Sequence, residues 1–157
     1  MICNIWSATY TSYGKRSNIV TPFHYLVTVP SSQTDELGNW HSPYFFLAFF
    51  DARKALFESM GATDERLKNE KLAIIVGALE CSYSRPLSKG EQASVQTTVI
   101  NLGRSSMTFR CEVYNAHNQL CAIGKTTQIL IDTETRKSTE LATWIREPLK
   151  DYINVIQ

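Results

Sequence analysis

Apolar and polar positions alternate along residues 22–30, PFHYLVTVP, a stretch that is also rich in strand-favouring residues. A period of two is typical of a half-buried strand, and the proline at each end limits its length. After the polar loop SSQTDELGNW the pattern changes to a nearly unbroken apolar run, YFFLAFF. We predict a helix here, of roughly five turns and about 27 Å, with Ser42 as N-cap, Pro43 as first residue and Gly61 as its stop.

The two halves of this helix differ in polarity. The first half is apolar on all sides, which is typical of an enclosed helix, whereas DARKALFESM regains polar positions and should reach a surface. After a charged connection, GATDERLKNEK, the pattern predicts four strands separated by turn-forming residues, over residues 71–85, 92–100, 106–115 and 119–132. The tail favours a short final helix over residues 143–152, interrupted or ended near Pro148.

The order strand, long helix, four strands predicts an α+β fold. A five-stranded antiparallel sheet wrapped around one long central helix satisfies this order, because the helix can hide its phenylalanines only against the concave face of the sheet. With 157 residues the chain suits a single domain, which we place over residues 1–157 with a core at about 22–147 and a short C-terminal tail.

The charge balance and the search for targeting signals bear on the partners and the cellular location of the protein. Lys and Arg number 16 against 15 Asp and Glu, so no overall field recruits nucleic acid or an anionic membrane. The N-terminal segment lacks the pattern of a secretory signal, and the longest apolar stretch, residues 44–50, is far shorter than the ~20 residues that a membrane span requires. We therefore expect a cytoplasmic protein with no nucleic-acid partner and no membrane span.

The spacing of cysteines and histidines argues against a metal or redox centre. The four cysteines are Cys3, Cys81, Cys111 and Cys121. They lack CxxC spacing and dense packing, so reduced structural thiols are expected. The three histidines are His24, His41 and His117. They form no HxH or HExxH, and neither GxGxxG nor a P-loop motif occurs, so the sequence predicts no metal and no cofactor.

The polar loop before the long helix carries candidate chemistry. Asp35 should lie near the free N–H groups and the positive dipole end at the helix start. A carboxylate beside an oxyanion-binding amide can hydrolyse an activated ester, because one group attacks or activates water and the other holds the negative charge that forms. The alternative is that Asp35 merely caps a turn before Gly38. His41 either orients a carbonyl or a water, or is a solvated loop side chain.

Other candidate residues also have a structural alternative. Ser42 is either an N-cap or a nucleophile, and no G-x-S-x-G elbow surrounds it. Tyr44 and Phe45 either pack in the core or form a substrate wall. Basic residues near the predicted strand ends are surface charges unless a phosphorylated ligand has to be held; these are Arg85, Lys89, Arg104 and Lys125.

Four motifs occur in a defined order. Asp35-Glu-Leu-Gly38 is followed by a helix containing Phe-Phe-Asp-Ala-Arg53 and then by Ser-Met-Gly61. The later motifs are Tyr83-Ser-Arg-Pro86-Leu with Lys89-Gly-Glu91, then Gly103-Arg-Ser-Ser-Met-Thr-Phe109, and then Gly124-Lys-Thr-Thr. Over about residues 22–147 this series resembles the 4-hydroxybenzoyl-CoA thioesterase branch of the hot-dog superfamily.

The resemblance implies a hot-dog fold, a homodimer or homotetramer, and metal-free hydrolysis of acyl-CoA or acyl-carrier-protein thioesters. It implies that Asp35 is the nucleophile or general base and that a backbone N–H near the helix start binds the oxyanion. Pro43 has no N–H, so Tyr44 or Ser42 would supply it, with His41 beside them. The substrate-binding residues that the resemblance implies are Phe45, Arg85, Lys89, Arg104, Ser105 and Ser106.

The sequence departs from this family at three places, one of which is residues 39–42, where many relatives carry His, Val, Asn or Tyr. Many relatives carry a helical Glu where Phe50 stands here, and Asp51 lies about 100° further round the helix. Many also carry an earlier Asp where Gln33 stands. Two other functions therefore stay open: a hot-dog dehydratase of 3-hydroxyacyl thioesters that uses His41, and a noncatalytic module that binds acyl thioesters.

Overall fold

The computed structural model describes residues 20–154, so Cys3 and the segment tested for a targeting signal lie outside the described residues. The strands are β1 Phe23–Thr28, β2 Leu72–Tyr83, β3 Gln92–Leu102, β4 Ser106–Asn115 and β5 Leu120–Asp132. The helices are α1 Ser42–Ser59, α2 Asp64–Asn69 and α3 Thr143–Leu149, with short 3-10 turns η1 Ser31–Gln33 and η2 Lys150–Tyr152. The predicted strands and the long helix are confirmed, with ends that differ by a few residues.

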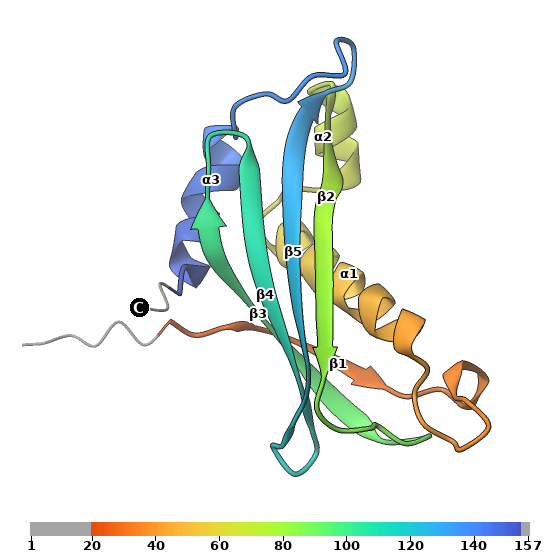
Figure 1. Ribbon diagram of the computed structural model, residues 1–157. Helices are drawn as coiled ribbons and strands as arrows, with labels where there is room; N and C mark the ends of the chain where they lie inside the picture. The colour runs from red at the N-terminus through yellow and green to blue at the C-terminus, as the bar shows by residue number, and fades with distance from the viewer. Residues whose placement is uncertain (1–19, 155–157) are drawn as a thin grey trace, which may run out of the picture.

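The five strands form one antiparallel sheet in the order β1-β3-β4-β5-β2 (Figure 1). β3, β4 and β5 are joined by short turns and lie side by side, as hairpin connections require. α1 connects β1 to β2 along the chain, and these two strands form the two edges of the sheet. Near the middle of β2 the register shifts between Val76 and Ala78, and this bulge increases the local twist of the edge strand.

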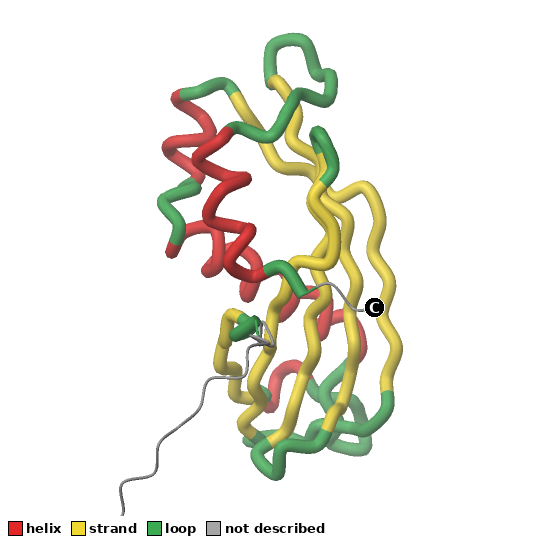
Figure 2. Tube along the Cα trace, turned by 90° about the vertical axis from the view of Figure 1, so that its left-hand side faces the viewer, coloured by secondary structure: helices red, strands yellow, loops and turns green. Residues whose placement is uncertain are grey.

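The helices lie against one face of the curved sheet (Figure 2). α1 buries a stripe with helical spacing, made of Phe45, Ala48, Phe49, Ala52, Arg53, Leu56 and Phe57. Gly124 of β5 lets the helix approach closely, because a Cβ at this position would overlap the ring of Phe49. The expected sheet around a central helix is thus confirmed.

Three local expectations need correction, and two are confirmed. The first half of α1 is not enclosed within this chain, since Leu47 and Phe50 are 46% and 48% exposed. His41 is the N-cap and Ser42 the first helical residue, and no side-chain cap bond forms. The charged connection after α1, for which no helix was predicted, contains α2. Its N-cap Thr63 accepts a hydrogen bond from the Arg66 N–H. The Gly61 stop is confirmed by its φ of 76°, and α3 ends at Leu149, directly after Pro148.

Consecutive connections alternate between the two ends of the sheet. The start of α1, the β2–β3 connection and the β4–β5 turn share one end, which lies at the bottom of Figure 1. The β3–β4 turn and the start of β2 lie at the other end, where α3 packs. Because a strand rises about 3.3 Å per residue, the eleven residues of β3 hold these ends roughly 35 Å apart. Among residues 20–154, no helix has the length and apolar character that a bilayer crossing requires.

Candidate active site

Asp35 shapes the loop that precedes α1. Its Oδ1 accepts hydrogen bonds from the N–H groups of Leu37 and Asn39, each at 2.9 Å, and its own N–H donates to the Asn39 carbonyl at 2.8 Å. Gly38 completes the turn with a φ of 78°, in the left-handed region that favours glycine. Asp35 therefore caps the turn before Gly38. Its Oδ2 makes no hydrogen bond within residues 20–154 and remains available for chemistry.

This loop is fixed against the β2–β3 connection. The Trp40 N–H donates to the Leu87 carbonyl at 2.7 Å, and the Lys89 N–H donates to the Gly38 carbonyl at 3.0 Å. The buried Trp40 indole also donates to Gln33 Oε1 at 3.0 Å. These bonds hold the Asp35 turn at a defined position relative to the end of β2.

The first turn of α1 leaves one backbone donor open. The Tyr44 N–H donates to the His41 carbonyl at 3.0 Å, so it is already occupied. Pro43 has no N–H. The Ser42 N–H has no acceptor among residues 20–154, and it lies at the positive end of the helix dipole. Of the two oxyanion donors considered from the sequence, the geometry favours Ser42.

A cavity of about 440 Å³ joins these groups at the end of the sheet. Its lining residues are Asp35, Asn39, Trp40, His41, Ser42, Phe45, Tyr83, Ser84, Arg85 and Pro86. Asp35, His41, Ser42 and Arg85 therefore line one space. An activated carbonyl held there would meet both a nucleophile or base and an oxyanion donor.

Aromatic side chains form the apolar side of this cavity. The Phe45 ring lies 4.6 Å from the Trp40 ring and 5.2 Å from the Tyr83 ring, centroid to centroid. The Tyr83 hydroxyl donates to the Ser42 carbonyl at 3.3 Å. Partial desolvation of the hydroxyl, followed by its interaction with Cys81, raises the pKa of Tyr83 to about 12, so this hydroxyl is a donor at neutral pH. Phe45 is 3% exposed and belongs to the hydrophobic core, so the packing alternative is confirmed, and the same residue also lines the cavity.

Other predicted site residues are not brought to this cavity. Tyr44 packs half-buried against the core, and Lys89 is exposed at the same end of the sheet but outside the lining. Arg104 and Ser105 lie in the β3–β4 turn at the opposite end, and Ser106 begins β4 there. There Ser105 and Ser106 offer backbone carbonyls to Leu130 N–H and Gly103 N–H, while exposed Arg104 lies 3.9 Å from Glu140. In one protomer these three residues cannot contact a carbonyl at Asp35.

Five lining residues had no site role predicted from the sequence: Asn39, Trp40, Tyr83, Ser84 and Pro86. The motif from Tyr83 to Pro86 was a signal for the last three, because it begins where β2 ends at the mouth of the cavity. Phe50, where relatives carry Glu, lines a second cavity, which lies between α1, α2, β2 and β5. Asp51 lines neither this second cavity nor the Asp35 cavity. Within the described residues, no three His, Cys, Asp or Glu side chains gather closely enough to hold a metal ion.

The family follows from a comparison with protein-family models. The model described as the thioesterase-like superfamily matches residues 29–149, which include every residue lining the Asp35 cavity. The chain belongs to this superfamily, and its sheet wrapped around α1 is the hot-dog fold. No curated protein sequence matches the chain.

Solved structures share this fold. Slr0204, a 1,4-dihydroxy-2-naphthoyl-CoA thioesterase from Synechocystis, has 19% identity and a TM-score of 0.77 over 82% of this chain and 96% of its own. SAV2348 from Staphylococcus aureus, solved in complex with CoA, has 16% identity and a TM-score of 0.83 over 93% and 92%. The dynemicin thioesterase has 14% identity and a TM-score of 0.80 over 86% and 99%. At these identities the likeness shows the fold alone.

Proposed function

We propose that the protein hydrolyses acyl thioesters of CoA or of an acyl carrier protein to the free acid and the thiol. The observation that carries the proposal is the shared cavity of Asp35, with its open Oδ2, and Ser42, with its open N–H. Membership of the thioesterase-like superfamily supports it, as does the fold shared with solved acyl-CoA thioesterases.

The reaction assigns one role to each group. Asp35 Oδ2 either attacks the thioester carbonyl, forming an anhydride that water then cleaves, or removes a proton from the water that attacks directly. In both routes the Ser42 N–H stabilises the tetrahedral oxyanion, and the thiolate leaves and takes up a proton. His41 lines the same space and can orient the water or the carbonyl.

Arg85 is the basic residue that lines the Asp35 cavity, and exposed Lys89 lies near its rim. Arginine binds phosphate through its planar fork of N–H donors. We assign the phosphates of CoA or phosphopantetheine to Arg85, with Lys89 as a second contact. Arg104 of the same protomer is not part of this assignment, because it lies at the far end of the sheet from Asp35.

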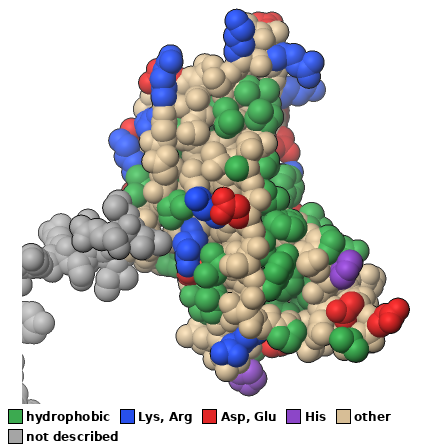
Figure 3. All heavy atoms as spheres, viewed as in Figure 1, with side chains coloured by type: hydrophobic (Ala, Val, Ile, Leu, Met, Phe, Trp, Pro, Cys, Tyr) green, Lys and Arg blue, Asp and Glu red, His purple; other side chains and the backbone are tan. Residues whose placement is uncertain are grey.

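We also propose that the protein forms a homodimer through β2. Among residues 20–154, β2 pairs with β5 alone, and its outer edge has no partner strand along twelve residues. Apolar side chains gather over this side of the sheet (Figure 3), and the exposed ones on β2 are Ile75, Val76, Leu79 and Tyr83. A long exposed apolar edge favours pairing with another strand. A second copy supplies that strand if β2 pairs antiparallel with its own equivalent.

A thiol-release assay tests the proposal against its rivals. Aromatic, short, long and 3-oxo acyl-CoAs would be assayed with a thiol reagent, together with acylated carrier protein. A hydrolase releases one thiol per free acid with saturable kinetics. A dehydratase converts a 3-hydroxyacyl thioester without releasing thiol, and a binding module retains the ligand without turnover. Either of these two results would overturn the proposed activity.

A further inference from the structure

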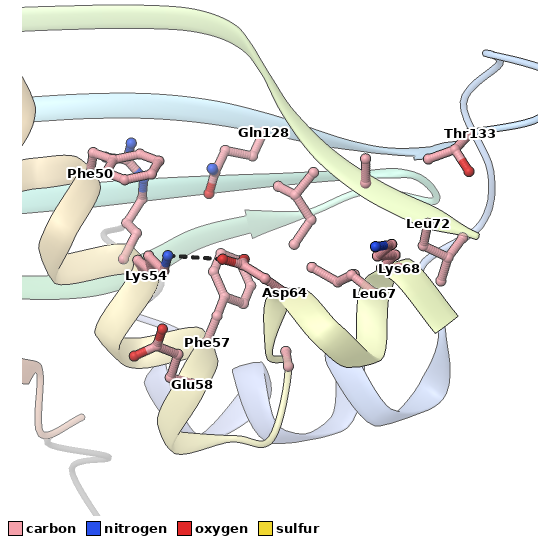
Figure 4. A pocket seen from close by; sticks show the side chains of 14 residues that line it. Phe50, Lys54, Phe57, Glu58, Asp64, Leu67, Lys68, Leu72, Gln128 and Thr133 are labelled. Carbon is pink, nitrogen blue, oxygen red and sulfur yellow. Dashed lines mark hydrogen bonds and ion pairs between the residues drawn. The ribbon is translucent and has the colours of Figure 1, made fainter. Parts of the chain in front are cut away.

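A second cavity, of about 350 Å³, lies between the second half of α1, α2 and the strands β2 and β5. Figure 4 shows it bounded by Phe57 on α1, Leu67 on α2 and Gln128 on β5. Phe50, Leu72 and Ile74 add to its apolar wall. Lys54 lies at this cavity and forms a 2.9 Å ion pair with Asp64. The volume is in the range of small-ligand sites.

A buried cation lines this cavity. Arg53 is 2% exposed because it falls on the buried stripe of α1, four residues after Phe49 and four before Phe57. Its Nη1 donates to Thr126 Oγ1 on β5 at 3.0 Å, whereas its Nε has no hydrogen-bond partner among residues 20–154. The side chain is therefore anchored at one nitrogen and unsatisfied at another.

Within the described chain, no Asp or Glu carboxylate lies within ion-pair distance of Arg53. Its acidic neighbour is the Cys111 thiol, and burial raises the pKa of that thiol, so it stays neutral. Burial also lowers the pKa of Arg53, yet a guanidinium remains protonated in proteins. A buried charge without a counterion is costly, which makes this position suited to an anionic ligand.

Gln128 adds a second polar group to the same wall. It lies two residues after Thr126 on β5, so both side chains point to the same face of the sheet. Gln128 is 6% exposed, and its Oε1 is buried without a partner among residues 20–154. Its amide carries donors and an acceptor that a ligand or an accompanying water can engage.

From this arrangement we infer that the second cavity binds a carboxylate carried on an apolar chain or ring. The carboxylate accepts hydrogen bonds from the guanidinium of Arg53 and the amide of Gln128, and the apolar part packs against Phe50, Phe57 and Leu67. A carboxylate matches the planar donor edge of arginine and costs less to desolvate than a doubly charged phosphate. The ligand is either a free carboxylic acid or the far carboxylate of a dicarboxylic acyl thioester.

Calorimetric titration with octanoate and with octan-1-ol tests this inference without requiring turnover, so its outcome is independent of the proposed activity. Wild type should bind octanoate more tightly than octanol. Arg53→Met should weaken octanoate binding about tenfold or more and leave octanol binding unchanged, because a charge-assisted hydrogen bond is lost. Gln128→Glu, which supplies an internal counterion to Arg53, should weaken octanoate binding similarly.

Lys125→Met is the matched control, because Lys125 is exposed and adjacent to Thr126 on β5 but on the other face of the sheet. It should change octanoate affinity less than twofold.

Competition by octanoate against octanedioyl-CoA hydrolysis would identify the far carboxylate of the substrate as the ligand, and noncompetitive inhibition would identify the free acid. No saturable octanoate binding by wild type, or equal binding by folded Arg53→Met and Gln128→Glu, would overturn the inference.

Discussion

The Tyr83 hydroxyl donates a hydrogen bond to the carbonyl oxygen of Ser42 at 3.3 Å, which joins the end of β2 to the first residue of α1. The ring of Tyr83 also packs edge-on against Phe45, one turn into the helix. Through these two contacts the helix start, with its open Ser42 N–H, is held next to Arg85. The edge strand thus positions the proposed oxyanion donor.

Tyr83→Phe should lower kcat for thioester hydrolysis about fivefold, because losing one hydrogen bond of about 1 kcal/mol loosens the Ser42 amide. The factor should stay constant from pH 6 to pH 9, since the hydroxyl, with its pKa raised to about 12, is protonated throughout that range. Steady-state kinetics at several pH values measure this. A factor that grows towards pH 9 would instead point to proton transfer by Tyr83.

Gly124→Ala should destabilise the fold by about 1–3 kcal/mol, because the added methyl group overlaps the buried ring of Phe49 and forces α1 from the sheet. Equilibrium unfolding in urea measures the change. Lys125→Ala, next along β5 but exposed on the other face, should stay within about 0.5 kcal/mol of wild type. Equal stability of the two variants would show that the helix does not depend on this close approach.

Leu79→Glu should convert the proposed dimer to a monomer, because it places a charge on the open edge strand at a side chain that is 43% exposed. Leu26→Glu is the control, since Leu26 is 78% exposed on β1, the opposite edge of the sheet. Light scattering during size-exclusion chromatography gives the mass of each. A monomeric wild type, or a dimer that survives Leu79→Glu but not Leu26→Glu, would contradict pairing through β2.

Much of the fold could be predicted because its periodicities are strong. The alternation in β1 and the Gly61 stop each indicate one structure by local physics. The short helix α2 was missed because its charges dominate the pattern, although Thr63 before an acidic turn is an N-cap signal. The exposure of Phe50 could not be predicted, since an apolar run does not say which of its faces the same chain covers.

The site was predictable in part. Asp35 and Ser42 are close in sequence and so remained together in space. Arg104 was grouped with them because of its positive charge and its family-like motif, although alternating connections in an antiparallel sheet place the β3–β4 turn at the far end. The spacing of four residues between Phe49 and Arg53 indicated that Arg53 lies on the buried stripe of α1. A charged residue on such a stripe, however, is normally expected at its edge. Its lack of a carboxylate partner could be seen only in three dimensions.

The most direct test of the proposed mechanism is thiol release by Asp35→Asn. An asparagine keeps an oxygen that can accept from Leu37 and Asn39, so the loop should persist, but its amide can neither attack a carbonyl nor take a proton. With a substrate that wild type hydrolyses, kcat should fall at least about 100-fold while KM and thermal stability change little. Glu36→Gln, the exposed neighbour, should keep wild-type rates. An Asp35→Asn variant that releases thiol at the wild-type rate would contradict the account.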